Sequence, residues 1–291
     1  FLKTFVNKGI ITDYDLERFY GSINTITNKL NSDLRLTKTR KGKNKFLNLY
    51  GHLRPSTYSI SSKNYRENFD SYFAKNDRKK NKTINRKFLF KLNSQNLIDK
   101  FFNINNLKID CKNFLTFSSE AIKLREYSKF IFTKCINEIF VNLISLGKEI
   151  NISREDMEHI SIKGILNYYN NVESGFKLKR QLLKEINENK KNLNILKLIE
   201  FPDFIQNKDD MYFHVINKKK GNFITTKKVN GPLVDFTNVK KYNLLSGKIV
   251  LLKNADPGYD FIFSKNIIGL ITEYGGANSH MSIRCLELGI P

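Results

Sequence analysis

Hydrophobic residues follow two different patterns along the chain. In the first two-thirds they recur at intervals of three and four residues, which is typical of helices. The clearest helix is expected from Ser119 and Glu120 to about Gly147, a natural stop. Because it carries two apolar stripes, we expect burial on more than one side, at the centre of a helical domain. The stripes are Leu124, Ile131, Cys135, Ile139, Leu143 and Leu146, and Ile122, Phe130, Ile136, Phe140 and Ile144.

Capping residues predict further helices in this part of the chain. They are Asp13–Tyr20, opened by Thr12 and Asp15; a helix opened by Ser153 and Asp156; and a long helix from Ser174 to near Pro202.

The pattern changes after about Asp210 to short β-rich runs separated by Gly, Asn, Asp and Pro turns. The expected strands are Met211–Ile216, Asn222–Thr226, Gly231–Phe236, Lys248–Leu252 and Ile267–Thr272. We therefore expect an α+β chain of two domains, residues 1–210 mainly helical and residues 211–291 rich in strands, joined near Asn207–Asp210.

Composition narrows the class of protein. With 40% hydrophobic residues the chain can bury a core, and it contains no run of eighteen apolar residues, so we expect no membrane span. The first residue is Phe1 and not an initiator Met, so we expect the N-terminus to belong to a longer polypeptide, and no signal peptide is visible. The cysteines Cys111, Cys135 and Cys285 lie far apart, which favours free thiols in a reducing cytoplasm.

The net charge of +22 raises the possibility of a basic nucleic-acid-binding protein. The basic residues are widely spread, with dense runs only at Lys38–Lys45 and Arg78–Lys91, and solvated surfaces explain such runs more often than polyanion sites. The same positive charge would also favour the binding of nucleotide phosphates, so it does not distinguish a nucleic-acid-binding protein from a nucleotide-using enzyme. We do not expect nucleic acid as a partner, but we keep it as the non-enzymatic alternative.

Candidate chemistry lies between Gly269 and Arg284. This segment predicts a buried strand, a loop with Gly275 and Gly276, and a helix from about Ser279 to Leu288. Ser279 as N-cap places His280 in the first turn, where free backbone N–H groups and the helix dipole favour negative charge. A neutral imidazole is a competent nucleophile at pH 7. The alternative is an ordinary, half-exposed histidine at a helix start.

A family resemblance rests on this segment. The pattern Thr272-x-x-Gly275-Gly276-x-x-Ser279-His280-x-x-Ile283-Arg284, followed by Glu287-Leu-Gly-Ile-Pro291, resembles the phosphohistidine motif of the PEP-utilising enzymes. Ala255-Asp-Pro-Gly-Tyr-Asp260 resembles the loop that enters the same domain. Asn278 and Ser282 depart from the common Thr and Ala. The resemblance implies that residues 211–291 form a swivelling β/β/α phosphohistidine domain, incomplete at its C-terminal end.

The resemblance also implies a reaction. In the family an ATP-grasp domain uses ATP and Mg²⁺ to phosphorylate the histidine, leaving AMP and phosphate, and the histidine then phosphorylates an acceptor. No Gly-rich nucleotide loop precedes the helices here, so ATP and Mg²⁺ are expected on an ATP-grasp domain of the same polypeptide, and this chain is expected to be inactive alone. The residues expected to support the phosphate and its loop are Thr272, Gly275, Gly276, Ser279 and Arg284. Arg284 could equally pair with Glu287 on the helix surface.

The central region resembles synthase-like members of the family at Tyr50–Ile60 and Ala121–Phe130. His52 and Arg54 could bind a carboxylate or phosphate of the acceptor, or could form a structural turn in which Arg54 caps a helix end. Other charged residues are expected to have ordinary roles, and no metal site is expected. They are Arg125, Glu126 and Lys129, read as a solvated ion-pair ladder, and Asp256, Asp260 and Glu273, read as loop acids.

Together the matches look closest to the L-glutamine kinase branch, whose members phosphorylate the glutamine side-chain amide for capsule phosphoramidate. The expected acceptor is therefore a small molecule, with L-glutamine first. Phosphoenolpyruvate synthase and a rifampicin-type phosphotransferase are the alternatives within the family.

Overall fold

The computed structural model describes residues 2–73, 88–170, 175–196, 198–199, 205–212, 221–239, 242–277 and 279–291. Its contacts divide the chain into two compact units. The first contains Phe1–Thr57, Ser62–Asn137 and Asn222–Pro291, and the second contains Tyr58–Ser61 and Glu138–Gly221. This division differs from the expected boundary near residues 207–210, because the C-terminal segment packs with the N-terminal helices. Separate movement of residues 211–291 stays a prediction.

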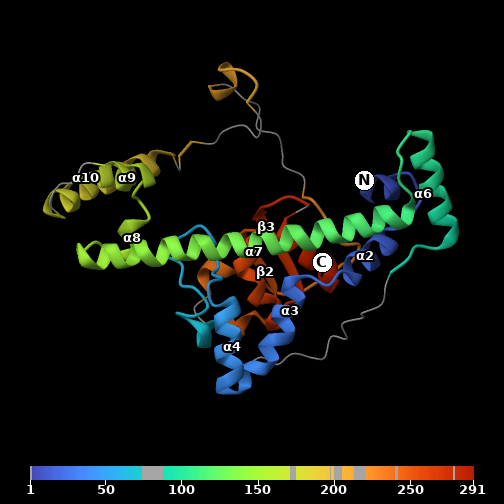
Figure 1. Cartoon of the computed structure of the whole chain (residues 1–291), viewed down its shortest axis with the longest axis horizontal. Helices are drawn as coiled ribbons and strands as arrows, with labels where there is room; N and C mark the ends of the chain where they lie inside the picture. The colour runs from blue at the N-terminus through green and yellow to red at the C-terminus, as the bar shows by residue number, and fades with distance from the viewer. Residues whose placement is uncertain are drawn as a thin grey trace. The chain divides into compact units, whose positions relative to one another are not determined.

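Short helices make up the N-terminal part of the first unit (Figure 1). They are α1 (Leu2–Asn7), α2 (Asp13–Ser22), α3 (Ile26–Asp33), η1 (Leu34–Lys38), α4 (Arg40–Tyr50), α5 (Phe69–Phe73) and α6 (Leu92–Ile104). The predicted start of α2 is confirmed, since Thr12 and Asp15 form a reciprocal capping box.

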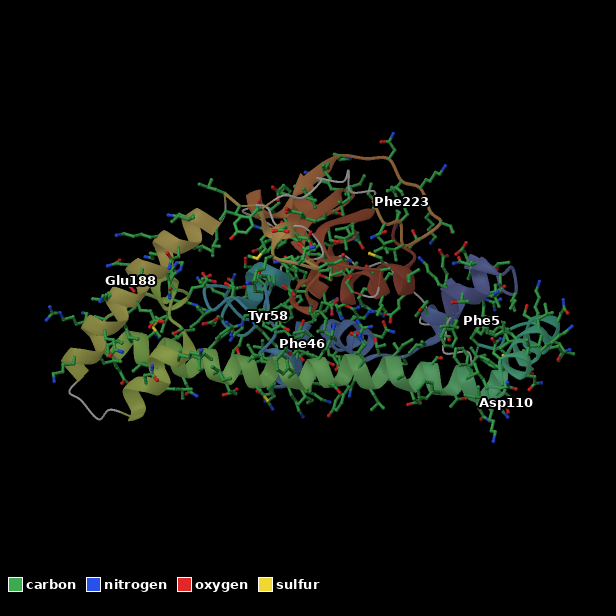
Figure 2. The ribbon with its side chains drawn as sticks, turned by 90° about the horizontal axis from the view of Figure 1, so that it is seen from above. Phe5, Phe46, Tyr58, Asp110, Glu188 and Phe223 are labelled. Atoms are coloured by element: carbon green, nitrogen blue, oxygen red, sulfur yellow. The ribbon has the colours of Figure 1, made fainter. Side chains whose placement is uncertain are left out.

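Helix α7 (Cys111–Glu149) is longer than the sequence predicted at both ends. It begins after Asp110, which is labelled in Figure 2 and accepts a hydrogen bond from the Asn113 N–H at 2.7 Å. At the other end Asn151 adopts a left-handed φ of 54°, and the Ile152 N–H donates to the Gly147 carbonyl at 2.8 Å. This closure places the stop at Asn151 and leaves Gly147 inside the helix.

The expected burial of α7 on two sides is wrong. Leu124 is 63% exposed and Ile131 is 41% exposed, whereas Glu126 and Phe130 are buried. Length and composition alone would allow α7 to cross a membrane. Its buried face, however, packs within the first unit and carries a charged residue of the site described below.

A three-stranded parallel sheet forms the C-terminal part of the first unit, in the order β1-β2-β3. The strands are β1 (Leu233–Asp235), β2 (Ile249–Asn254) and β3 (Gly269–Tyr274), and the connections contain η3 (Phe236–Asn238), η4 (Tyr242–Leu245) and η5 (Pro257–Lys265). Helix α11 (His280–Leu288) follows β3. Three of the expected strands are thus confirmed, each shifted or shortened by one or two residues, and the α+β class agrees with this arrangement.

Two other expected strands have different outcomes. Residues Asn222–Thr226 form no strand, and Thr226 instead donates from its N–H and hydroxyl to Glu17. For the run Met211–Ile216, residues 213–216 lie outside the described residues, and Met211 ends the short helix η2 (Asp209–Met211).

An aromatic core explains why residues 222–291 belong to the first unit. Side chains from α4, α5 and the loop after α4 pack against η4 and η5 in one cluster. Its aromatic members include Phe46 (labelled in Figure 2), Tyr50, Tyr65, Tyr72, Phe73, Tyr242 and Phe261. The Tyr65 hydroxyl also donates to the Gly258 carbonyl at 2.9 Å, which fixes η5.

The second unit is helical. It contains the end of α7 with α8 (Arg154–Met157), α9 (Ile162–Asn170) and α10 (Gly175–Leu196). The predicted cap of α8 is confirmed, because the Ser153 hydroxyl accepts from the Asp156 N–H. The predicted limits of the long helix, Ser174 and Pro202, lie outside the described residues.

Candidate functional site

The loop between β3 and α11 aims His280 into the unit. Gly275 has a φ of 144°, and a Cβ at this position would lie 2.7 Å from the Ala255 Cβ, so only glycine fits without strain. Ser279 then caps α11 by accepting from the Ser282 N–H at 3.2 Å. The predicted strand, glycine loop and helix are confirmed, with His280 as the first helical residue. The expected burial of the strand is wrong, since Ile271 is 48% exposed.

Ser282, one of the departures from the common motif, braces this loop. Its hydroxyl donates to the Gly276 carbonyl at 3.0 Å and lies 2.8 Å from the Ser279 hydroxyl. Thr272 pairs in register with Leu252 in the sheet. The support of a phosphate by Thr272, Gly275, Gly276 and Ser279 stays a prediction, and Asn278 lies outside the described residues.

The His280 side chain is 3% exposed and lies between two carboxylates. Its Nδ1 is 2.5 Å from Glu126 Oε2, and its Nε2 is 2.9 Å from both carboxylate oxygens of Asp260. Burial by itself would lower the pKa of His280, but Asp260 and Glu126 outweigh burial and raise it to about 9. At pH 7 the ring is therefore an imidazolium that donates from both nitrogens. The ring is thus neither the neutral imidazole expected of the nucleophile nor the half-exposed histidine of the alternative, and the carrier role of His280 stays a prediction.

Both carboxylates were assigned ordinary roles by sequence, and both expectations are wrong. Glu126 on α7 is 4% exposed and faces His280 rather than a solvated ladder. Burial tends to raise the pKa of Glu126, but the hydrogen bond and positive charge of His280 lower it overall. Asp260 on η5 is 2% exposed. One signal in the sequence could have indicated both residues. Glu126 lies in Ala121–Phe130 and Asp260 lies in Ala255–Asp260, two segments that resemble the PEP-utilising enzymes.

Arg284 lies one turn after His280 and is 1% exposed. Its Nη1 donates to Asn28 Oδ1 at 2.7 Å and also pairs with Glu287, so the expected pairing exists but is buried rather than on the surface. Its Nε lies 3.6 Å from Asp260 Oδ1. Among the described residues, Nε and Nη2 have no hydrogen-bond partner.

A cavity of about 20 Å³ adjoins His280, which is room for about one water. It is lined by Ile26, Leu30, Tyr50, Leu53, Glu126, Lys129, Phe130, Thr133, Pro257, Asp260 and His280. A larger groove of about 580 Å³ lies beside Ala277 and Leu286 and is bordered by α1, α2 and α7.

His52 and Arg54 are buried and bonded to protein groups. His52 Nε2 lies 3.3 Å from the Phe130 carbonyl, and burial lowers the pKa of His52 to about 4, so this ring is neutral. Arg54 donates to the Ser62 carbonyl and to Asn137 Oδ1. Neither residue lines the cavity beside His280. Their contacts fix the loop that holds η5; their role in acceptor binding stays a prediction.

The carboxylates of the site do not form a metal centre. Across the part of the chain that the structure describes, no three His, Cys, Asp or Glu residues gather in a metal-binding arrangement. Glu126 and Asp260 are instead occupied by His280.

Comparison with known proteins decides how the C-terminal segment is classified. Residues 244–291 match the family model described as PEP-utilising enzyme, mobile domain. This segment is similar to the mobile domain of the PEP-utilising enzymes. The mobile domain, residues 244–291, includes Asp260, His280 and Arg284, whereas Glu126 lies outside it. A search of curated proteins gives no match to the chain. The family match supports a phosphotransferase.

Proposed function

We propose that His280 carries a phosphoryl group from ATP to a small acceptor in a dikinase-type phosphotransferase. The observation that carries this proposal is the position of His280, the first residue of α11 in a PEP-utiliser mobile domain, with both ring nitrogens held by carboxylates. Such a site fixes the orientation of the ring and favours a proton on each nitrogen.

The arrangement suits the carrier after it has given up its phosphoryl group. When an acceptor attacks phosphorylated His280, the acceptor–phosphorus bond forms, the N–P bond breaks and its electron pair returns to the imidazole. The acceptor loses a proton in this step. The imidazole, held between Glu126 and Asp260 with a pKa of about 9, is a suitable final place for that proton.

The small cavity limits when the acceptor can bind. Its volume of about 20 Å³ admits about one water, so an amino acid does not fit beside His280 in this arrangement. The acceptor therefore binds when the mobile domain has moved away from α7. Glu126 and Lys129, which line this cavity, then remain available to bind the acceptor.

For the acceptor itself we propose the side-chain amide of L-glutamine, with ATP and Mg²⁺ bound by an ATP-grasp domain of the same polypeptide in the cytoplasm. Support comes from the resemblance of Tyr50–Ile60, Ala121–Phe130 and the His280 motif to that branch. Phosphoenolpyruvate synthase and rifampicin-type phosphotransferase activities remain the alternatives.

The test uses the full-length polypeptide and ATP labelled at the β-phosphate. We expect acid-labile label on the wild type and on H159A, a histidine of the second unit, and none on H280A. Labelling of H280A would contradict the carrier role. Release of AMP that is stimulated by glutamine, and not by pyruvate or rifampicin, would identify the acceptor.

The same preparations test the non-enzymatic alternative. Salt-dependent polyanion binding that is equal in the wild type and H280A, with no label on either, would favour a nucleic-acid-binding protein.

A further inference from the structure

The charged and polar groups around His280 come from two different parts of the chain. Asp260, Arg284 and Glu287 belong to the mobile domain, as His280 does. Glu126 lies on α7, and Asn28, which binds Arg284, lies on α3. When the mobile domain moves as a body, His280 therefore keeps Asp260 and Arg284 and leaves Glu126 behind.

Arg284 has an unused hydrogen-bonding edge. Nε and Nη2 lie along one edge of the planar guanidinium, and neither has a hydrogen-bond partner among the described residues, although the side chain is 1% exposed. A buried donor without a partner is costly, and such a group calls for an explanation. This edge presents two parallel N–H groups, the arrangement that binds phosphate oxygens in a bidentate manner.

One carboxylate oxygen links this edge to the reacting nitrogen. Asp260 Oδ1 is 2.9 Å from His280 Nε2 and 3.6 Å from Arg284 Nε. The Asp260 carboxylate thus lies in the position beside Arg284 Nε that an anionic group attached to His280 Nε2 would take. Nδ1, by contrast, faces Glu126, which does not travel with the mobile domain.

We propose that Arg284 binds the phosphoryl group of phosphorylated His280 through Nε and Nη2, and that Asp260 occupies this position while His280 is unphosphorylated. The proposal rests on the carrier role of His280. In the loading step the Nε2 proton passes to Asp260, which weakens its ion pair with Arg284. Nε2 then bonds to phosphorus, and the anhydride P–O bond of the nucleoside triphosphate breaks with its electron pair on the leaving oxygen.

The test phosphorylates this chain directly with potassium phosphoramidate, a small donor whose P–N bond breaks with loss of ammonia. The ³¹P resonance of the phosphohistidine is followed against pH in the wild type, R284Q, R284K and D260N. R66Q, which removes a surface arginine bound to the Leu47 carbonyl, is the matched control. H280A identifies the signal, and thermal unfolding shows which variants fold.

A guanidinium in contact with the phosphoryl group lowers the phosphoryl pKa, by about one unit for a close opposite charge. We expect this lowered pKa in the wild type, D260N and R66Q, a smaller effect in R284K, and a value near that of free phosphohistidine in R284Q. An identical titration in the wild type and folded R284Q would overturn the proposal. If R284Q does not fold, a titration of R284K identical to the wild type overturns it instead.

Failure of the carrier role has a separate signature. If the wild type gains no acid-labile phosphorus, or gains as much as H280A does, the proposed function fails before Arg284 is tested. A His280-dependent signal that titrates independently of Arg284 leaves the carrier role intact and removes only the role of Arg284.

Discussion

The carboxylate of Glu126 accepts a hydrogen bond from the His280 imidazole at 2.5 Å, although the two residues are 154 positions apart. This bond couples the protonation of His280 to its contact with α7. Because the contact raises the pKa of His280, protonation of the ring must in turn strengthen the contact. A ring that loses its positive charge is therefore held less strongly by α7.

The first prediction concerns the substitution Glu126→Gln. Removing the negative charge on α7 should lower the pKa of His280 from about 9 towards its ordinary value of 6.5, because only Asp260 then stabilises the imidazolium. The measurement is an NMR titration of the His280 ring. E120Q, which changes an exposed glutamate of the same helix, should leave that pKa unchanged. Equal pKa values in E126Q and the wild type would show that this contact does not form in solution.

The second prediction concerns stability and pH. His280 has a raised pKa in the folded chain, so its contribution is complete below pH 6.5 and is lost as the pH rises from 6.5 to about 9. The full contribution is about 3 kcal/mol in the free energy of unfolding. Chemical denaturation across this range should show the decline in the wild type. H280Q, which has no titrating ring, should show a much flatter profile, and parallel profiles would refute the coupling.

Local sequence signals were sufficient for the elements that surround His280. Gly275 and the Ser279 cap determine a strand, turn and helix within a few residues, and the sequence predicted all three. The partners of His280 are different, because Glu126 comes from a helix far away in sequence. The helical spacing of Arg125, Glu126 and Lys129 favoured a solvated ion-pair ladder. Only the tertiary packing of α7 buries Glu126.

The limits of α7 show the same distinction. Asp110 caps the helix, whose first residue Cys111 lies eight residues before the predicted start at Ser119. Asn151 stops it in a left-handed conformation that more often belongs to glycine. Gly147 looked like the stop, yet a Cβ there would lie 3.0 Å from Met157 Cγ, so packing accounts for the glycine. Sequence pattern alone could not separate a glycine needed for close packing from one needed for a turn.

The third prediction separates the two glycines of the loop. Gly275→Ala places a Cβ 2.7 Å from the Ala255 Cβ at a φ of 144°, and should cost roughly 1–3 kcal/mol in the free energy of unfolding. Gly276→Ala meets no atom within 4 Å and should change stability by less than about 0.5 kcal/mol. Equilibrium denaturation of both variants provides the measurement. Equal losses would contradict the loop conformation.

The fourth prediction tests how η5 is held. A Cβ on Gly258 would lie 1.3 Å from the Arg54 carbonyl oxygen, a backbone atom that cannot move aside easily. Gly258→Ala should separate η5 from the loop after α4, displace Asp260, and lower the pKa of His280. NMR titration of the ring is again the measurement. Gly21→Ala is the control, because its Cβ makes only an ordinary contact of 3.8 Å.

The parallel sheet has a consequence for how the chain folds. Each of its strand pairs, β1 with β2 and β2 with β3, joins strands that run in the same direction, so neither can form from a tight hairpin. Each pair must instead close over an intervening connection, which slows folding relative to a local turn. Association of the strands, rather than formation of the helices, should therefore set the rate at which the His280 segment becomes native.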